Sequence, residues 1–149
     1  MADIAARSLA PIGAAFTAIT LITGALWGQP MWGTWWVWDA RLTSVAILFI
    51  IYLVIIFMNL SFENRVVREK VVAIFVLVGS INLPIVKFSV DWWNTLHQTA
   101  TISKLSKPSI DPTMLTPLII MTLAFMMIGL AISILRIKTE IISRKSNIS

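Results

Sequence analysis

Four long stretches without a charged side chain constrain the fold of this chain more than any other feature of its sequence. They lie between Arg7 and Asp39, Arg41 and Glu63, Lys70 and Lys87, and Asp111 and Arg136. A run of about 20 apolar residues, coiled as an α-helix, crosses the hydrocarbon core of a bilayer. Lipid offers backbone amides no hydrogen-bonding partner, so a spanning segment has to satisfy them itself. The sequence therefore predicts an all-α integral membrane protein built as a bundle of four transmembrane helices.

We expect a single membrane domain over residues 1–149. Its four spans are placed at about Leu9–Trp27, Leu42–Leu60, Val71–Phe88 and Leu115–Leu135. Charged residues make up only 13% of the chain, whereas a soluble domain has about 25%. The low fraction agrees with a domain whose helices lie mostly in lipid.

The basic residues divide unequally between the two ends of the predicted spans. One side receives eight of them: Arg7, Arg65, Arg68, Lys70, Arg136, Lys138, Arg144 and Lys145. The other side receives four: Arg41, Lys87, Lys104 and Lys107. Because loops rich in Lys and Arg stay in the cytoplasm, we expect both termini and Ser61–Lys70 there, with Gly28–Arg41 and Ser89–Met114 facing outward. Bases in these positions indicate membrane orientation, and they do not favour a nucleic-acid partner.

All seven tryptophans lie on the predicted outer side. Five fall between Trp27 and Trp38, and Trp92 and Trp93 follow in the second outer connection. An aromatic belt normally decorates both membrane interfaces, whereas this cluster is one-sided. It favours a surface that binds a flat apolar molecule such as a porphyrin or a quinone, and a simple belt is the alternative.

The densest part of the cluster is WGTWWVWD, residues 32–39. On a helix, the spacing i, i+3, i+4, i+7 places four side chains on one face: Trp32, Trp35, Trp36 and Asp39. Gly28, Pro30 and Gly33 are expected to begin or bend this segment rather than extend the first span. The pattern therefore predicts a short amphipathic, tryptophan-rich segment along the outer membrane surface, with Trp38 to one side if the segment is helical.

Two polar side chains beside these tryptophans are candidates for contacts with a haem. The Arg41 guanidinium suits a carboxylate such as a haem propionate. An equal alternative is that Arg41 is a topology-neutral anchor at a helix end. His97 is the only histidine and would lie beside Trp93 on a helix. Imidazole is a common axial ligand of haem iron, and its second nitrogen then needs an acceptor, for which Asn94 and Asp91 are candidates. The alternative for His97 is a solvated side chain.

Several kinds of chemistry are excluded by what the sequence lacks. Without cysteine there is no disulfide, thiolate metal site or thioether attachment of a cofactor. HExxH, Walker A and GxSxG motifs are also missing. We therefore predict no catalytic residue, and a binding protein rather than an enzyme.

The longer motifs resemble a known family. WGTWWVWD is similar to the signature of the WWD-domain family of membrane haem-handling proteins. DARLTS, INLPIVKFSVDWWNTLHQ and SIDPTMLTP resemble the haem exporter protein C (CcmC) branch, over about Ile4–Arg136. The resemblance implies a helical bundle that holds haem b on its periplasmic face, with His97 as a ligand of the iron. The residues expected to hold the porphyrin are Trp32, Gly33, Trp35, Trp36, Trp38, Asp39, Arg41, Trp92 and Trp93.

The resemblance also implies partners and a location. Proteins of this kind present haem to a periplasmic haem chaperone (CcmE-like) for cytochrome c maturation. They work with a small helper subunit (CcmD-like) and ABC transporter subunits (CcmA- and CcmB-like) in a bacterial or organellar inner membrane. Two alternatives remain: a haem-b-binding membrane anchor of a respiratory oxidoreductase, and a structural or permease-like membrane subunit. An anchor of the first kind buries its histidines within its spans, and none of the expected spans contains one. In the second kind the tryptophans are only a belt, and intramembrane charge, which supports a transport path, is limited to Lys87.

One departure from the family is large. Its members have six spans, and the first two spans and a first axial histidine have no counterpart in these 149 residues. We interpret the sequence as a fragment of a longer reading frame rather than one part of a split protein. The four spans alone are expected to bind haem weakly, with an open coordination position on the iron.

Overall fold

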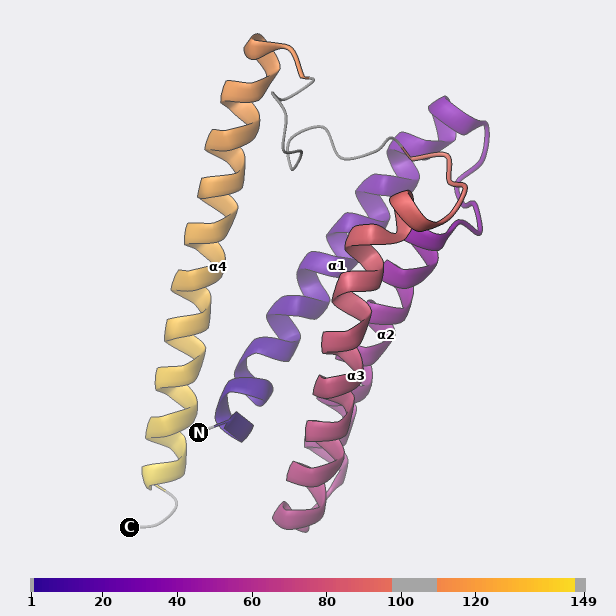
Figure 1. Ribbon diagram of the computed structural model, residues 1–149. Coiled ribbons are helices and arrows are strands. Elements are labelled where there is room, and N and C mark those ends of the chain that lie inside the picture. The colour runs from indigo at the N-terminus through magenta and orange to yellow at the C-terminus, as the bar shows by residue number, and fades with distance from the viewer. Residues whose placement is uncertain (1, 98–109, 147–149) are drawn as a thin grey trace.

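Four long helices make up the computed structural model, which describes residues 2–97 and 110–146 (Figure 1). They are α1 (Ala2–Trp32), α2 (Ala40–Ser61), α3 (Arg65–Trp92) and α4 (Pro112–Ser146). Each is long and apolar enough to cross a membrane, and the described residues contain no strand. The prediction of an all-α, four-span membrane protein is confirmed.

The first helix continues beyond the expected span, through Gly28 and Pro30 to Trp32. The expectation that these two residues begin a separate segment is therefore wrong. The helix ends where Gly33 adopts a φ of +74° and its N–H donates to the carbonyl of Gln29 at 2.9 Å. Glycine adopts this left-handed conformation without the Cβ penalty that other residues incur, which is why helices commonly end on it.

The helical geometry considered for residues 32–39 is not observed. Trp32 is the last residue of α1, and the backbone from Gly33 to Asp39 is not helical. Asp39 has extended backbone angles, and its Oδ1 accepts a hydrogen bond from the N–H of Leu42 at 2.8 Å. Aspartate is a preferred N-cap because it satisfies an N–H left free at a helix start. The local chemistry of Gly33 and Asp39 therefore makes this stretch a loop between two helices.

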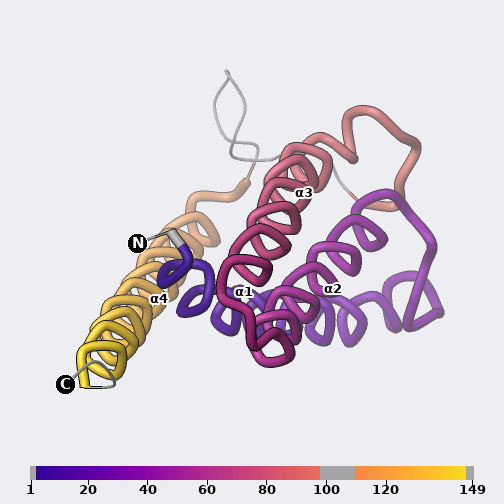
Figure 2. Tube along the Cα trace, turned by 90° about the horizontal axis from the view of Figure 1, so that it is seen from below, coloured from indigo at the N-terminus to yellow at the C-terminus, as the bar shows by residue number. Residues whose placement is uncertain are grey.

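Helices α1, α2 and α3 pack together, and α4 lies beside α1 (Figures 1 and 2). The buried core joins Ala10 of α1, Ile51 and Ile55 of α2, and Val72 of α3. In contrast, α4 has no buried residue. The three packed helices therefore form the part of the molecule that positions residues 33–39 before α2 and residues 93–97 after α3.

A buried polar contact joins α2 and α3 close to that end. The side-chain amide of Asn82 donates to the backbone carbonyl of Ser44 at 2.9 Å, and both residues are buried. A hydrogen bond in such surroundings restrains the helix register more than apolar contacts alone. It holds the start of α2 beside the last turns of α3, so the residues before α2 and after α3 lie near each other.

Candidate functional site

The loop before α2 and the segment after α3 meet through a buried carboxylate. Oδ2 of Asp39 lies 2.5 Å from Nδ1 of His97. The hydroxyl of Thr95 donates to the same carboxylate oxygen at 2.5 Å and lies 3.3 Å from Nδ1. It also accepts the backbone N–H of His97 at 3.1 Å. Asp39 thus caps α2 with one oxygen and fixes the segment after α3 with the other.

The charge on Asp39 follows from these contacts. Burial, which leaves its side chain only 5% exposed, would raise the pKa of the carboxyl. Hydrogen bonds from Thr95, from the Leu42 N–H and from His97, with the charge of His97 when protonated, outweigh burial and lower the pKa below its ordinary value of 3.8. Asp39 is therefore ionised at neutral pH and acts only as an acceptor.

This ionisation determines which nitrogen of His97 carries the proton. A carboxylate without a proton can accept from Nδ1 but cannot donate to it, so Nδ1 has to be the N–H of the ring. In the neutral imidazole the lone pair then lies on Nε2. The described residues make hydrogen bonds to Nδ1 and none to Nε2, so Nε2 is the nitrogen whose lone pair can bind a metal.

The acceptor beside His97 differs from the one that the sequence predicts. Asn94 and Asp91 are the expected partners, and the observed partners are Asp39 and Thr95. The reason is the end of α3 at Trp92, because an extended backbone follows and removes the helical spacing on which the expectation rests. Thr95 is not predicted at all, and the only sequence signal is a hydroxyl two positions before the single histidine.

The aromatic neighbour of His97 also differs from the expected one. Its ring centroid lies 4.9 Å from that of Trp32, with the planes at 73°, whereas the expected neighbour is Trp93. Trp32 in turn meets Trp27 edge-on at 5.3 Å. The last turns of α1 therefore supply one wall beside the imidazole, through an indole already predicted as part of the site.

The other tryptophans form two further groups. Trp36 and Trp38 meet edge-on at 5.5 Å, while Trp92 stacks on Phe88 at 5.5 Å and meets Trp93 at 5.9 Å. Within the described residues, neither group makes a ring contact with His97. Five indoles are more than half exposed: Trp27, Trp35, Trp38, Trp92 and Trp93. These rings expose apolar surface at the end of the bundle that carries His97, here called the tryptophan-rich face, and among the described tryptophans only Trp32 makes a ring contact with His97.

Two donor groups among the candidate residues lack a protein partner in the described part of the chain. The indole N–H of Trp36 is buried and has no hydrogen-bond partner among the described residues. Arg41 lies in the first turn of α2, and its guanidinium has no ion-pair partner in the same part of the chain. Both are donors that a ligand with acceptor oxygens can satisfy.

A bare metal ion does not suit this site. Nowhere in residues 2–97 and 110–146 do three or more His, Cys, Asp or Glu side chains gather closely enough to hold one. His97 offers a single nitrogen, so the arrangement suits a metal that arrives with most of its ligands already in a flat macrocycle.

The four apolar helices define a multi-pass membrane protein, with tryptophans and a histidine at one end of its bundle. The family described as CcmC, Heme exporter protein C, matches residues 1–149. The chain belongs to this family, and the resemblance seen in its sequence motifs is confirmed.

Individual relatives agree with the family assignment. Heme exporter protein C of Bradyrhizobium diazoefficiens is 48% identical over 145 residues, covering 97% of this chain and 55% of the relative. The protein of the same name from Haemophilus influenzae is 48% identical, covering 95% and 57%. A putative cytochrome c biosynthesis ccmC-like mitochondrial protein of Arabidopsis thaliana is 54% identical, covering 72% and 40%. The chain spans about half the length of the curated relatives it matches.

Proposed function

We propose that this protein binds haem b on its tryptophan-rich face and delivers it for cytochrome c biogenesis. The observation that carries the proposal is the contact between Asp39 and His97, which leaves Nε2 of the imidazole free for iron. The names of the relatives, heme exporter and cytochrome c biosynthesis proteins, support the same cargo. Haem is a substrate here, which the protein holds and passes on without chemical turnover.

The residues around His97 fit a haem in three ways. His97 supplies an axial nitrogen, and the exposed indoles supply flat apolar surface for the macrocycle. Arg41 supplies a guanidinium fork for a propionate. The indole N–H of Trp36, which lacks a partner among the described residues, is a further donor for a propionate oxygen.

Asp39 and Thr95 act on haem through His97. The carboxylate keeps the proton on Nδ1 and raises the basicity of Nε2, as acceptors behind metal-bound histidines do. The Thr95 hydroxyl orients the same carboxylate and holds the His97 backbone N–H. The imidazole is therefore pre-oriented before haem arrives, and less side-chain freedom is lost on binding.

The open shape of the face suits delivery rather than storage. With five indoles more than half exposed, one edge of a bound macrocycle stays within reach of a second protein. We propose that a periplasmic haem chaperone (CcmE-like) takes haem from this edge. A CcmD-like helper and CcmA- and CcmB-like transporter subunits are the proposed assembly partners in the inner membrane.

The proposed orientation places the tryptophan-rich face in the periplasm and both termini of this chain in the cytoplasm. It rests on the unequal division of Lys and Arg between the two ends of the spans. Of the outward bases, Lys104 and Lys107 lie outside the described residues. Since the sequence has one histidine, we expect haem on these four helices alone to have one open coordination position.

The test is haem retention by the purified chain in detergent, measured by absorbance and by haem extraction. His97→Ala is expected to lose most of the bound haem, because no other histidine replaces it. Asn94→Ala is the matched control, since Asn94 is exposed in the same segment and makes none of the contacts above. Equal retention by His97→Ala and the control would contradict the proposal and favour a structural membrane subunit.

A further inference from the structure

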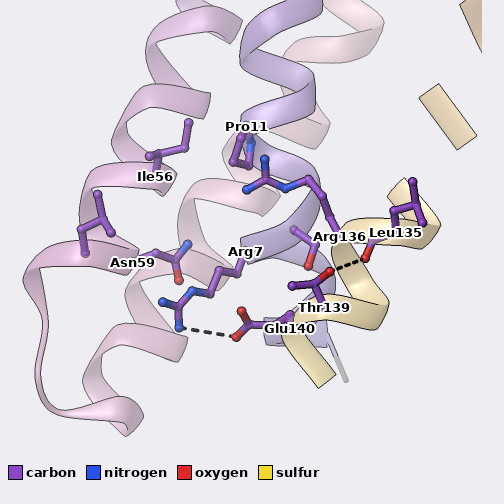
Figure 3. Close-up of a pocket in the computed structure, with 10 residues that line it drawn as sticks. Arg7, Pro11, Ile56, Asn59, Leu135, Arg136, Thr139 and Glu140 are labelled. Carbon is purple, nitrogen blue, oxygen red and sulfur yellow. Dashed lines mark hydrogen bonds and ion pairs between the residues drawn. The ribbon is translucent and has the colours of Figure 1, made fainter. Parts of the chain in front are cut away.

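A polar cavity of about 450 Å³ lies at the end of the bundle opposite Asp39 and His97 (Figure 3). Helices α1, α2 and α4 form its walls. Its polar lining consists of Arg7, Ser8, Asn59, Arg136, Thr139 and Glu140. Arg7 and Arg136 are also the charged residues that bound the uncharged runs of α1 and α4, so the cavity lies where a bilayer has its headgroups.

The charges around the cavity are unbalanced. Glu140 lies 3.5 Å from Arg7 and 2.8 Å from Arg144, and Arg144 also contacts Asp3 at 2.6 Å. Arg136 has no ion-pair partner in the described part of the chain, and Figure 3 shows its guanidinium beside Pro11 in the cavity. The lining itself carries two guanidinium groups, Arg7 and Arg136, and one carboxylate, Glu140, so the surplus positive charge is that of Arg136.

A buried acceptor also lacks a partner there. Asn59 is 6% exposed, and its amide nitrogen donates to the carbonyl of Ile55 at 2.9 Å. Its Oδ1 receives no hydrogen bond from any described residue. Figure 3 shows this side chain pointing from α2 toward Arg7. Buried polar atoms are nearly always paired, so a ligand with both an anionic group and a hydroxyl donor fits the cavity.

An apolar groove continues from the polar cavity between α1 and α4. It encloses about 350 Å³ and shares Pro11 and Arg136 with the cavity. Ile12, Phe16 and Phe125 are among the apolar residues that line this groove. A further apolar hollow then shares Phe16 and Phe125 with the groove. A charged cavity that continues into a long apolar groove matches the shape of a phospholipid, in which a headgroup is followed by an acyl chain.

We propose that the cavity and groove bind one anionic phospholipid with a hydroxyl-bearing headgroup, of the phosphatidylglycerol type. The phosphate pairs with Arg136 and Arg7, and a glycerol hydroxyl donates to Oδ1 of Asn59. An acyl chain lies between α1 and α4 against Phe16. A free phosphate satisfies the cavity but leaves the groove empty, whereas the lipid accounts for both. This site is separate from His97 and does not depend on the proposed haem function.

Competition among lipids tests the charge. The chain is placed in mixed micelles with phosphatidylglycerol and phosphatidylcholine, and bound lipid is counted by native mass spectrometry. Wild-type protein is expected to retain phosphatidylglycerol roughly tenfold better, and Arg136→Gln to lose most of this preference, as removal of a charged hydrogen bond predicts. Lys138→Gln is the matched control, because Lys138 is exposed on the same helix and does not line the cavity.

A second comparison tests the hydroxyl. Phosphatidylmethanol carries the same charge as phosphatidylglycerol but lacks the donor that Asn59 requires. Wild-type protein should prefer phosphatidylglycerol, and Asn59→Ala should bind the two lipids equally. Helix content by circular dichroism checks that each variant folds, and Arg136→Lys, which keeps the charge, should retain part of the preference if Arg136→Gln proves unstable.

Three outcomes would overturn the proposal. Equal losses in Arg136→Gln and Lys138→Gln would show general attraction to positive charge. Displacement of the lipid by millimolar inorganic phosphate would show an anion site without a lipid. Unchanged lipid preference in both Arg136→Gln and Asn59→Ala would show that the lipid binds elsewhere.

Discussion

Asp39 and His97 are 58 positions apart in the sequence, yet Oδ2 of one lies 2.5 Å from Nδ1 of the other. The same aspartate caps α2 through its second oxygen. One side chain therefore begins a membrane-spanning helix and determines the tautomer of the only histidine. The capping contact is local to residues 39–42, whereas the contact with His97 depends on how α2 and α3 pack, so the position of the imidazole depends on the fold of the bundle.

The two roles of Asp39 can be separated by substitution. Asparagine is as good an N-cap as aspartate, but it has a single amide oxygen. When that oxygen caps α2, only the NH₂ group, which is a donor, is left to face Nδ1. Asp39→Asn is therefore expected to keep the cap of α2, to lose the stability that the carboxylate adds through its contacts with His97 and Thr95, and to weaken haem retention. It should also raise the midpoint potential of bound haem, because the imidazole becomes a poorer donor to ferric iron.

Asp39→Ala supplies the comparison. It removes the cap as well and is expected to cost about 1 kcal/mol in stability. Potentiometric titration and thermal unfolding of both variants measure the two effects. An unchanged potential in Asp39→Asn would contradict the role assigned to the carboxylate, even if less haem were bound.

The contact between Asp39 and His97 should persist at acid pH. Because the pKa of Asp39 is lowered in the folded protein, the carboxylate adds stability that is fully present above its ordinary value of 3.8. This contribution is lost only as the pH falls through the lower, folded value.

The measurement is the difference in unfolding temperature between wild type and Asp39→Ala as a function of pH. The difference should stay constant from neutral pH down to the ordinary carboxyl value of 3.8 and shrink below it. A difference that disappears well above 3.8 would mean that Asp39 is not held as a carboxylate.

Trp32 is expected to contribute to haem binding through its ring contact with His97. Its ring meets that of His97 at 4.9 Å, so Trp32→Leu removes the wall that holds the imidazole on the α1 side. We expect weaker haem retention and a broader Soret band. Trp32→Phe keeps an aromatic edge and should restore part of the binding, whereas identical behaviour of the two variants would exclude a role for the ring contact.

The four spans were predictable because charge is costly in lipid, and the charge-free runs mark them without any knowledge of packing. The tryptophans and His97 were also recognisable, since both stand out in the sequence. The partner of His97 was not recognisable, because helical spacing was assumed beyond Trp92 whereas α3 ends there. A contact across 58 positions depends on how α2 and α3 pack, which local patterns do not contain.

Residues 33–39 show the same limit on a smaller scale. The spacing of Trp32, Trp35 and Trp36 fits a helix, yet Gly33 and Asp39 are typical of a helix end and a helix start. Those two residues determine the backbone here, because end signals act directly on backbone hydrogen bonds while side-chain spacing does not. Giving them priority over periodicity would have predicted the loop.

Two glycines on α1 provide a matched pair for testing how closely α1 and α2 pack. A Cβ built on Gly13 would lie 2.4 Å from the ring of Tyr52, whereas Gly24 has nothing within 4 Å. Gly13→Ala is expected to destabilise the bundle by about 1–3 kcal/mol through overpacking. Gly24→Ala should be neutral or stabilising by up to about 1 kcal/mol, because alanine favours a helix. The measurement is the unfolding temperature of the two variants in detergent. Equal shifts would show that Tyr52 moves aside and that α1 and α2 are not held in tight contact at Gly13.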